Sequence, residues 1–391
     1  MTQVLKGVHV VDLGTMITAP LAGMMLADLG AEVIKVEHPQ GGDPFRSFRG
    51  GLYSPHFVAY NRGKRSIRLD LRSDAGRKVL CQLLSRADIL IENYRAGVME
   101  KLGFGSSVLG ALNAKLIHCS ITGFGASGPY SGRPAYDTVG LALSGIASLL
   151  LDPENPQACG PTIPDNATGM FACYGILGAL YERERTGRGR RLEVNMLEAA
   201  ISFIPDPFAN YTQMGIKNDP LTRVASSHSF AFRCADGKLL ALHLSSQAKF
   251  WEGLLAAIAR PDLADDPRFA SRDQRIKNFI PLTHILAEVV ARKPRAEWMT
   301  LLEAHDVPFA PVHSIEDVID DTQVKYLETF RTLRHPTEGE ITAIRRPVRI
   351  DGGRDGSDLP APTLGEHTDT VLRELGYDDS AIAQMRSAKV I

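Results

Sequence analysis

The sequence predicts an α/β protein, with a large domain built on a mostly parallel sheet and a smaller α+β domain. Strand and helix patterns alternate three times in the first third of the chain, which is typical of a parallel sheet with helices on both faces. Beyond residue 225 a hairpin pattern precedes several helices, which indicates a second domain. A chain of 391 residues is long enough for two hydrophobic cores.

The first strand–helix–strand unit covers residues 7–37. Apolar strand patterns at 7–13 and 30–37 flank a helix rich in Ala, Gly and Met at 20–29. This Rossmann-like unit ends in Glu37, where a dinucleotide-binding fold places an acid on the ribose. Its loop reads DLGTMITAP, however, and lacks the G-x-G-x-x-G pattern of such folds. The sequence therefore argues against a nicotinamide cofactor.

Two further units complete the alternation. A basic turn leads into a strand at 60–72, an amphipathic helix covers 73–86, and strands follow at 87–94 and 115–121. Ligands of such sheets bind at the carboxyl ends of the strands. The loops expected there carry backbone donors and basic side chains that suit an anionic, phosphate-bearing ligand; they hold Thr15–Ala19, His38, Arg72, Asn93 and Gly123.

Asp165 precedes an apolar helix that we predict from about residue 166 to 185, with Gly187 as its left-handed stop. One interpretation makes Asp165 the N-cap of this helix, bonding the free N–H groups of the first turn. The other makes it a nucleophile. A carboxylate with a reference pKa of ~3.9 is ionised at neutral pH and needs no general base to attack a thioester. Neighbouring N–H groups would stabilise the oxyanion that forms. The local sequence leaves both interpretations open.

The remaining sequence predicts the domain division. We expect a large domain at 1–204 that residues 330–391 complete, a linker at 205–224, a small α+β domain at 225–325 and a return linker at 326–364. Within the small domain, two alternating runs around Asp236–Gly237 predict a hairpin. Helices are expected at 247–258, 280–291 and 294–305, with one more between 365 and 376.

Composition excludes several classes of protein. The 44 Lys and Arg against 45 Asp and Glu give a net charge of −1, so nothing points to nucleic acid or an anionic membrane. No apolar run reaches the ~18 residues of a membrane helix. The five cysteines are scattered and never spaced C-x-x-C, so we expect neither disulfides nor a metal site. With no signal-peptide pattern at the start, a cytoplasmic location is expected.

Eight motifs in fixed order carry a resemblance. They are LKGVHVVDLG, LADLGAEVIKVEHPQGGDPFR, NRGKRSIRLDL, ADILIENYRAGVMEKLG, SITGFGASGPYSGRPAYD, GILGALYERERTGRGRRLEVNMLEA, VPFAPVHSIEDV and LGEHTDTVLRELG, and they extend from near residue 5 to near 378. Together they make the sequence resemble the family III CoA-transferases of the CaiB/BaiF superfamily, which include formyl-CoA transferase and carnitine CoA-transferases.

This resemblance implies the site residues. The family's nucleophile matches Asp165. Its CoA contacts match Thr15, Met16, Ile17, Thr18, His38, Leu69, Arg72, Asn93, Tyr94, Lys101, Leu102, Arg133 and Met196. Formyl-CoA transferase has Arg at the position of His38 and Gln at that of Ile17, so one nucleotide contact is weaker here and a polar side chain near the acyl group is missing. Lys101 and Arg133 also fit plain surface charge, and Met196 fits core packing.

The resemblance also implies the reaction. CoA moves from an acyl-CoA donor to a carboxylic acid through an aspartyl anhydride and an aspartyl-CoA thioester, with CoA as substrate and no permanently bound cofactor. Residues 224–230 read VASSHSF where formyl-CoA transferase has a glycine lid, so a larger acyl group such as succinyl is expected. Two chains would interlock as a homodimer, with the extended segments 205–222 and 341–364 wrapping the partner.

The same superfamily includes 2-methylacyl-CoA racemases, the alternative function. Racemases use two bases, one of them a His just before the position of Asp137. Here that position holds Tyr136, whose reference pKa of ~10 suits a base poorly. His118 and His228 are the nearest replacements in sequence, and His118 lies in an apolar strand where a core role is expected. A non-catalytic CoA-binding protein is the third possibility, against which the full Asp165 motif argues.

Overall fold

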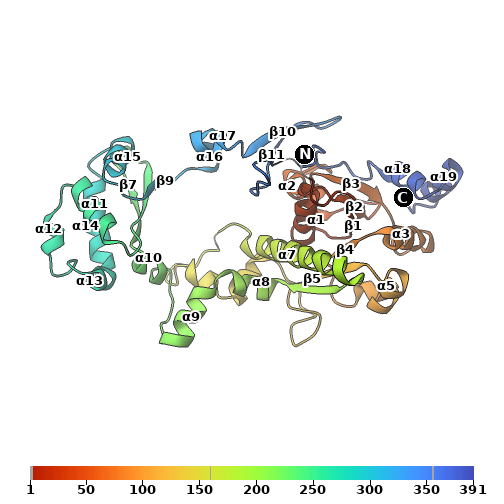
Figure 1. Cartoon of the computed structure of the whole chain (residues 1–391), viewed down its shortest axis with the longest axis horizontal. Helices are drawn as coiled ribbons and strands as arrows, with labels where there is room; N and C mark the ends of the chain where they lie inside the picture. Colours follow the sequence, from red (N-terminus) through yellow and green to blue (C-terminus); the bar gives the residue numbers. More distant parts are fainter. Residues whose placement is uncertain (1–2, 159, 355) are drawn as a thin grey trace. The chain divides into compact units, whose positions relative to one another are not determined.

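The computed structural model describes residues 3–158, 160–354 and 356–391. The chain forms two compact units. The large unit comprises Met1–Ala147, Gly160–Pro205 and Tyr326–Ile391, and the small unit comprises Ser148–Cys159 and Asp206–Lys325. Figure 1 shows the elements of each unit along the chain. The α/β class predicted from the sequence is confirmed.

The large unit is built on a six-stranded parallel sheet with the order β3-β2-β1-β4-β5-β6. Its strands are β1 (His9–Asp12), β2 (Glu32–Glu37), β3 (Lys64–Arg68), β4 (Ile89–Glu92), β5 (Ile117–Thr122) and β6 (Arg191–Asn195). This order is that of the Rossmann fold, in which the chain reverses its direction of progress between β1 and β4. Loops after these two strands diverge and leave a crevice at the carboxyl edge.

Helices cover both faces of this sheet. Successive strand side chains point to opposite faces, so Val11 packs with α3 (Asp74–Arg86), α5 (Ser106–Leu112), α18 (Thr368–Glu374) and α19 (Asp379–Ser387). Val10 packs on the other face with α1 (Thr18–Asp28) and α7 (Ile163–Thr186). The C-terminal segment thereby completes the large unit.

Helix α7 is the longest helix in the described part of the chain, and it lies beside α1 (Figure 1). It ends at Gly187, whose φ of 66° gives the left-handed stop expected from the sequence. It begins at Ile163, three residues earlier than predicted, because Pro164 fits the first turn of a helix. Asp165 is therefore inside the first turn and is not the N-cap; that position belongs to Thr162.

Shorter elements connect these layers. They are η1 (Pro44–Ser47), α2 (Pro55–Asn61), α4 (Val98–Lys101), α6 (Asp137–Leu143), η2 (Ala147–Leu149) and α8 (Met196–Phe203). Four cysteines are free thiols: Cys81, Cys119, Cys173 and Cys234. Cys159 lies outside the described residues. Cys119 on β5 and Cys173 on α7 share the apolar layer between helix and sheet.

The small unit has the predicted hairpin, β7 (Ser229–Arg233) and β8 (Leu239–His243), and a third strand, β9 (Phe309–Pro311), pairs with β8. Three predicted helices are present as α11 (Ala248–Ala257), α14 (Phe279–Val290) and α15 (Arg295–Ala304). Shorter helices are α10 (Thr222–Ser226), α12 (Asp262–Asp265), α13 (Arg272–Lys277), α16 (Ile315–Asp320) and α17 (Thr322–Tyr326). Residues 224–230 thus span the end of α10 and the start of β7.

Two segments expected to be extended contain regular structure. Residues 205–222 include α9 (Pro205–Met214), which a proline at its first position and Asp206 in its first turn favour. Residues 330–344 form an antiparallel hairpin of β10 (Phe330–His335) and β11 (Gly339–Ile344), so part of 341–364 is strand. None of the described helices is both long and apolar enough to cross a membrane.

Candidate active site

The loops that follow the strands bring most of the predicted CoA-binding residues to one edge of the sheet. Thr15–Thr18 follow β1, His38 follows β2, Leu69 and Arg72 follow β3, Asn93 and Tyr94 follow β4, Arg133 follows β5 and Met196 follows β6. Arg72 lies beyond the end of β3, although the sequence places it on the strand, because Leu69 donates the last sheet hydrogen bond to Glu37. Lys101 and Leu102 lie at the end of α4.

Thr15 and Asn93 meet at the reversal point between β1 and β4. The Thr15 N–H donates to the Asn93 side-chain oxygen at 2.9 Å, and the Asn93 amide donates to the Thr15 carbonyl at 2.8 Å. The same amide reaches the Thr18 hydroxyl at 3.0 Å. The Asn93 side chain therefore fixes both ends of the loop that the sequence predicts to bind CoA.

Met16 has a φ of 65°, in the left-handed region that few residues other than glycine adopt. Its N–H faces the Asp43 carboxylate, with N–O distances of 3.1 and 3.2 Å. Within the described residues no acceptor bonds the N–H groups of Ile17 and Thr18 at the start of α1. These two donors point to an anion-binding helix start.

A buried charge network lies beneath this loop. We use that name for four residues: Asp12, Lys35, Asp43 and Lys64, each at most 1% exposed. Lys35 bonds the Asp43 carboxylate at 3.0 Å and the Gly14 carbonyl at 2.6 Å. Lys64 bonds Asp12 at 2.8 Å. Because each charge has an opposite partner, the network is neutral and its burial is tolerated.

His38 and Arg72 come together on the surface beside the loop. An Arg72 guanidinium nitrogen lies 2.9 Å from the His38 ring, and Arg72 also bonds Asp70 at 3.0 Å. Arg72 remains largely exposed. The arrangement leaves donor capacity on Arg72 for a phosphate. Lys101 and Arg133 are exposed as well, and Arg133 stacks 4.0 Å from the centre of the Tyr130 ring.

The apolar members of the predicted set are packed in the core. Ile17 is buried with Phe45, Phe57 and Ala361. Its backbone N–H, which has no acceptor among the described residues, is the polar group that position 17 offers at the start of α1. Leu69 is buried too, and Tyr94 and Leu102 pack against the same cluster.

Asp165 carries the most unusual electrostatic environment of this edge. Its N–H donates to the Asp137 carboxylate of α6 at 3.1 Å. No hydrogen bond to the Asp165 carboxylate itself is present among the described residues. Burial, with the nearby Asp137 charge as the second cause, raises the pKa of Asp165 to about 7. The raised pKa makes Asp165 harder to ionise than its reference pKa, used in the sequence analysis, implies.

Close helix packing joins the loop to Asp165. A Cβ at Gly169, one turn after Asp165, would lie 2.7 Å from the Thr18 carbonyl oxygen. A Cβ at Gly140 of α6 would lie 2.7 Å from the Met196 sulfur and 2.9 Å from Pro164. The starts of α1, α6, α7 and α8 thus converge, and they bring Thr18, Asp137, Asp165 and Met196 into one region.

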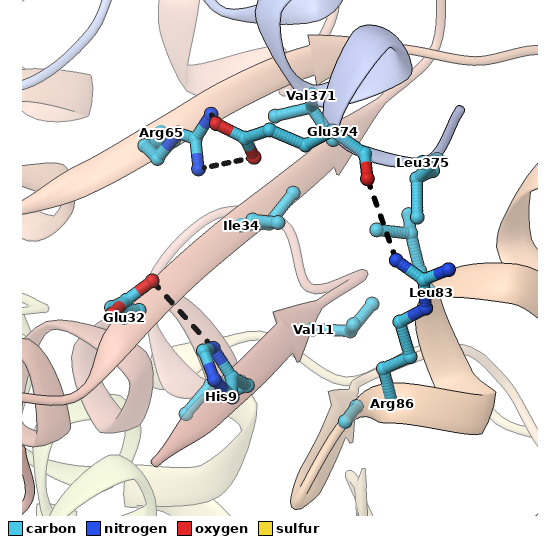
Figure 2. Close-up of a pocket in the computed structure, with 12 residues that line it drawn as sticks. His9, Val11, Glu32, Ile34, Arg65, Leu83, Arg86, Val371, Glu374 and Leu375 are labelled. Carbon is cyan, nitrogen blue, oxygen red and sulfur yellow. Dashed lines mark hydrogen bonds and ion pairs between the residues drawn. The ribbon is translucent and has the colours of Figure 1, made fainter. Parts of the chain in front are cut away.

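A cavity of about 310 Å³ lies at the opposite, amino edge of the sheet, between α3 and α18 (Figure 2). Val11, Ile34 and Leu83 line its apolar part. Its rim charges bind each other: Arg65 pairs with Glu374 at 2.8 Å and His9 with Glu32 at 3.6 Å. It holds none of the predicted site residues.

Glu37 is unavailable for a nucleotide ribose. Both of its carboxylate oxygens bind Arg46 at 2.7 Å, and one of them also accepts from Ser66.

Comparison with known proteins now fits this geometry. Residues 5–368 match the model of CoA-transferase family III. The chain belongs to that family. It is 33% identical to succinyl-CoA:glutarate CoA-transferase from Mus musculus, over 99% of this chain and 90% of the relative. It is 32% identical to formyl-CoA:oxalate CoA-transferase from Streptomyces avermitilis, over the full length of both. A CaiB/BaiF family protein from Brucella suis superposes with a TM-score of 0.84 and 31% identity, over 95% of this chain and 99% of the other.

This family III CoA-transferase is therefore an enzyme that acts on acyl-CoA. Sequence reasoning missed Asp43 and Lys35, and it considered Asp137 only as a landmark for the racemases. A signal for Asp43 existed, since Asp before Pro44 is typical of a helix N-cap. Nothing local indicated that its carboxylate reaches Met16, which is 27 residues away.

Proposed function

We propose that this enzyme moves CoA from an acyl-CoA donor to a small carboxylic acid through covalent intermediates on Asp165. The observation that carries the proposal is the Asp165 carboxylate, which is partly buried in the first turn of α7, accepts no hydrogen bond from the described residues and lies in the helix that packs against the predicted CoA loop. A carboxylate held only for structure would be paired with a cation or with N–H donors.

The chemistry runs through four substitutions at carbonyl carbons. An Asp165 oxygen attacks the donor thioester, the carbon–sulfur bond breaks, and CoA leaves as a thiolate. The thiolate then attacks the Asp165 carbonyl of the anhydride and releases the donor acid, which leaves an aspartyl-CoA thioester. The acceptor carboxylate attacks this thioester and expels the thiolate again. Attack of the thiolate on the acceptor carbonyl gives the new acyl-CoA and free Asp165.

The edge of the sheet supplies complementary groups for CoA. We expect Thr15–Thr18, His38, Arg72 and Asn93 to bind it, with Arg72 on a phosphate and the N–H groups of Ile17 and Thr18 on an anionic oxygen. Leu69, Tyr94, Lys101, Leu102, Arg133 and Met196 complete the predicted set. Helix-start donors and a guanidinium are suited to negatively charged oxygen.

The acids handled are proposed to be dicarboxylic. The relatives named above act on succinyl-CoA and glutarate or on formyl-CoA and oxalate, so dicarboxylic acids recur among them. Our preference for succinyl-sized groups rests on residues 224–230, which have no run of glycines. A matrix of acyl-CoA donors against mono- and dicarboxylic acids, read by mass spectrometry, tests this assignment.

The racemase alternative gains no support from the site. Tyr136 is 66% exposed, and His118 is buried on β5 within 3.4 Å of Glu92. Neither is placed as a second base for a substrate at Asp165. Incorporation of deuterium at the α carbon of a 2-methylacyl-CoA, without transfer to an added acid, would reverse this preference.

We further propose a homodimer. Four large side chains of α7 are at least 36% exposed: Met170, Phe171, Tyr174 and Tyr181. An exposed apolar face of this kind marks a protein interface, and a second copy of the chain would cover it. In the interlocked arrangement the segments 205–222 and 341–364 would wrap the partner. Sedimentation that finds an active monomer at micromolar concentration contradicts the dimer.

The covalent step has a direct test. The enzyme is incubated with acyl-CoA and treated with hydroxylamine, and the digest is examined by mass spectrometry. A hydroxamate on the peptide that contains Asp165 is expected. Label on another carboxylate, or rapid exchange with no label, contradicts the proposed nucleophile.

A further inference from the structure

The loop of residues 14–18 is held in a conformation that its own sequence disfavours. A left-handed φ costs an ordinary residue on the order of 1–2 kcal/mol, and Met16 adopts one at 65°. Such strain persists where the surrounding structure enforces it, often at functional sites. The enforcing group here is identifiable, because the Met16 N–H is directed at Asp43.

Asp43 is anchored on every side. Its carboxylate accepts from the N–H groups of Met16 and Phe45 and binds the Lys35 ammonium group at 3.0 Å. Lys35 in turn donates to the Gly14 carbonyl at 2.6 Å. Lys35 and Asp43 therefore bond the residues on either side of Thr15, and Asn93 bonds Thr15 itself. The anchored carboxylate thus holds the Thr15–Met16 peptide at the position from which Met16 enters α1 with a left-handed φ.

The conformation of Met16 determines the direction of the next two N–H groups, those of Ile17 and Thr18. With Met16 fixed, the backbone turns directly into α1, and the N–H groups of Ile17 and Thr18 stay without acceptors in the described residues. The close approach at Gly169 sets Thr18 beside the first turns of α7, which carries Asp165. The direction of these free donors therefore depends on the backbone at Met16.

We propose that Asp43, anchored by Lys35, is a positioning residue that keeps Met16 left-handed and thereby preorganises the N–H groups of Ile17 and Thr18 for CoA. This inference rests on the proposed function, since it concerns the loop assigned to CoA. The buried Lys35–Asp43 ion pair would then affect CoA binding as well as the stability of the fold.

The test measures CoA affinity by calorimetry. Asp43→Ala should weaken CoA binding roughly tenfold or more, because charge-assisted hydrogen bonds hold the loop. Met16→Gly added to Asp43→Ala should recover several-fold of that loss, because glycine adopts positive φ without strain. Met16→Gly alone is measured as the reference for the double variant, so that any contact made by the Met16 side chain is counted separately from the loss caused at Asp43. A purely structural role predicts no recovery.

The matched control is Asp28→Ala. Asp28 is the last residue of α1, the helix that follows the loop. Like Asp43, it is buried and pairs with a cation, here Arg62, but it lies at the far end of α1 from the loop. Asp28→Ala should lower the melting temperature and leave CoA affinity unchanged. Circular dichroism verifies that each variant is folded. If Asp43→Ala does not fold, Asp43→Asn with and without Met16→Gly makes the same comparison, with a smaller loss and the same direction of recovery.

The outcomes separate this inference from the proposed function. An original protein that neither binds CoA nor exchanges it overturns the proposed function. The positioning role alone is overturned if the original protein binds CoA and a folded Asp43 variant binds it equally well. It is also overturned if adding Met16→Gly to that variant recovers no affinity.

Discussion

The carboxyl edge of the sheet holds two pairs of carboxylates, one pair fully buried and the other partly exposed, and their surroundings differ in charge. Asp12 and Asp43 are fully buried against Lys64 and Lys35. Burial alone would raise the pKa of Asp12, but the lysines outweigh it and hold that pKa below its usual value. Asp137 and Asp165 have no ion-pair partner among the described residues, and burial raises the pKa of both. A carboxylate with a cationic partner maintains structure, whereas a raised pKa without such a partner is the pattern that the proposed reaction at Asp165 requires.

The largest test of this contrast substitutes one carboxylate from each pair. Asp165→Asn keeps the shape and removes the nucleophile, so exchange should fall by at least roughly 10⁴-fold while stability is preserved or increased. Asp12→Asn leaves two buried lysines with one carboxylate, and should destabilise the fold by about 3–5 kcal/mol. Initial rates and urea unfolding measure the two effects. Turnover by Asp165→Asn without deamidation back to Asp would erase the distinction.

The pH dependence sharpens the same contrast. In the proposed mechanism only the ionised Asp165 attacks, so kcat/KM should rise with pH through an ionisation near 7, the pKa of Asp165 in the folded protein. Asp137→Asn removes the charge that contributes to this pKa, so the rise should move to lower pH. The raised pKa of Asp165 makes the free energy of unfolding fall as pH rises, whereas a lowered pKa, such as that of Asp12, makes it rise. The folded state binds more protons between about pH 4 and 7, so this group stabilises the fold below that window and the contribution is lost as pH rises through it.

A pH profile therefore has two readouts. The Asp165→Asn variant should lose the part of the stability slope between pH 4 and 7 that this group supplies. A rate profile that is flat from pH 5 to 8 and unchanged in Asp137→Asn would show that the two carboxylates do not interact in the working enzyme.

The geometry that joins the two pairs is tested at Gly169. Gly169→Ala places a methyl group 2.7 Å from the Thr18 carbonyl oxygen, and such overpacking should cost about 1–3 kcal/mol and separate α1 from α7. Gly178→Ala is the matched control, because it lies in the same helix with no atom within 4 Å of the added Cβ. It should stabilise the helix by about 0.5–1 kcal/mol. Equal effects of the two changes on exchange would contradict the close approach.

The smallest expected effect concerns the exposed cations. Arg72→Ala should weaken CoA binding up to about fivefold at low salt, and less as salt is raised, because an exposed contact is screened. Arg86→Ala, at the cavity on the opposite edge (Figure 2), should leave CoA binding unchanged. Titrations at two salt concentrations measure both. Equal affinity of Arg72→Ala and the original at low salt would remove Arg72 from the site.

The order of strands and helices was predictable because each has a local signal. Alternation at β1 and β2 and the glycine stop at Gly187 are written in short windows of sequence. The hairpin of β10 and β11 was missed because only three of its twelve residues are buried, so its strands show little alternation of apolar side chains. The start of α7 was misplaced because the two prolines before Asp165 resemble a break as much as a helix start.

In the site, too, features with a local sequence signal were predictable and features made by tertiary contacts were not. Parallel strands end at one edge, so the meeting of Thr15 with Asn93 and of His38 with Arg72 fits a prediction made from loop positions alone. The raised pKa of Asp165 was not predictable, because Asp137 is 28 residues away and approaches only through packing of α6 on α7. The same holds for Asp43 and Met16. Electrostatic tuning belongs to tertiary contacts that no local pattern records.

The buried thiols of Cys119 and Cys173 are relevant to acylation of the enzyme by its own intermediate. An enzyme that forms an anhydride risks losing the acyl group to its own sulfur. Cys173 is roughly two turns along α7 from Asp165, yet burial raises its pKa to about 11, and burial raises that of Cys119 to about 12. Both remain protonated thiols at neutral pH, and a thiol is a far weaker nucleophile than a thiolate. In the proposed mechanism, the departing CoA thiolate would therefore not compete with these two sulfurs for the anhydride.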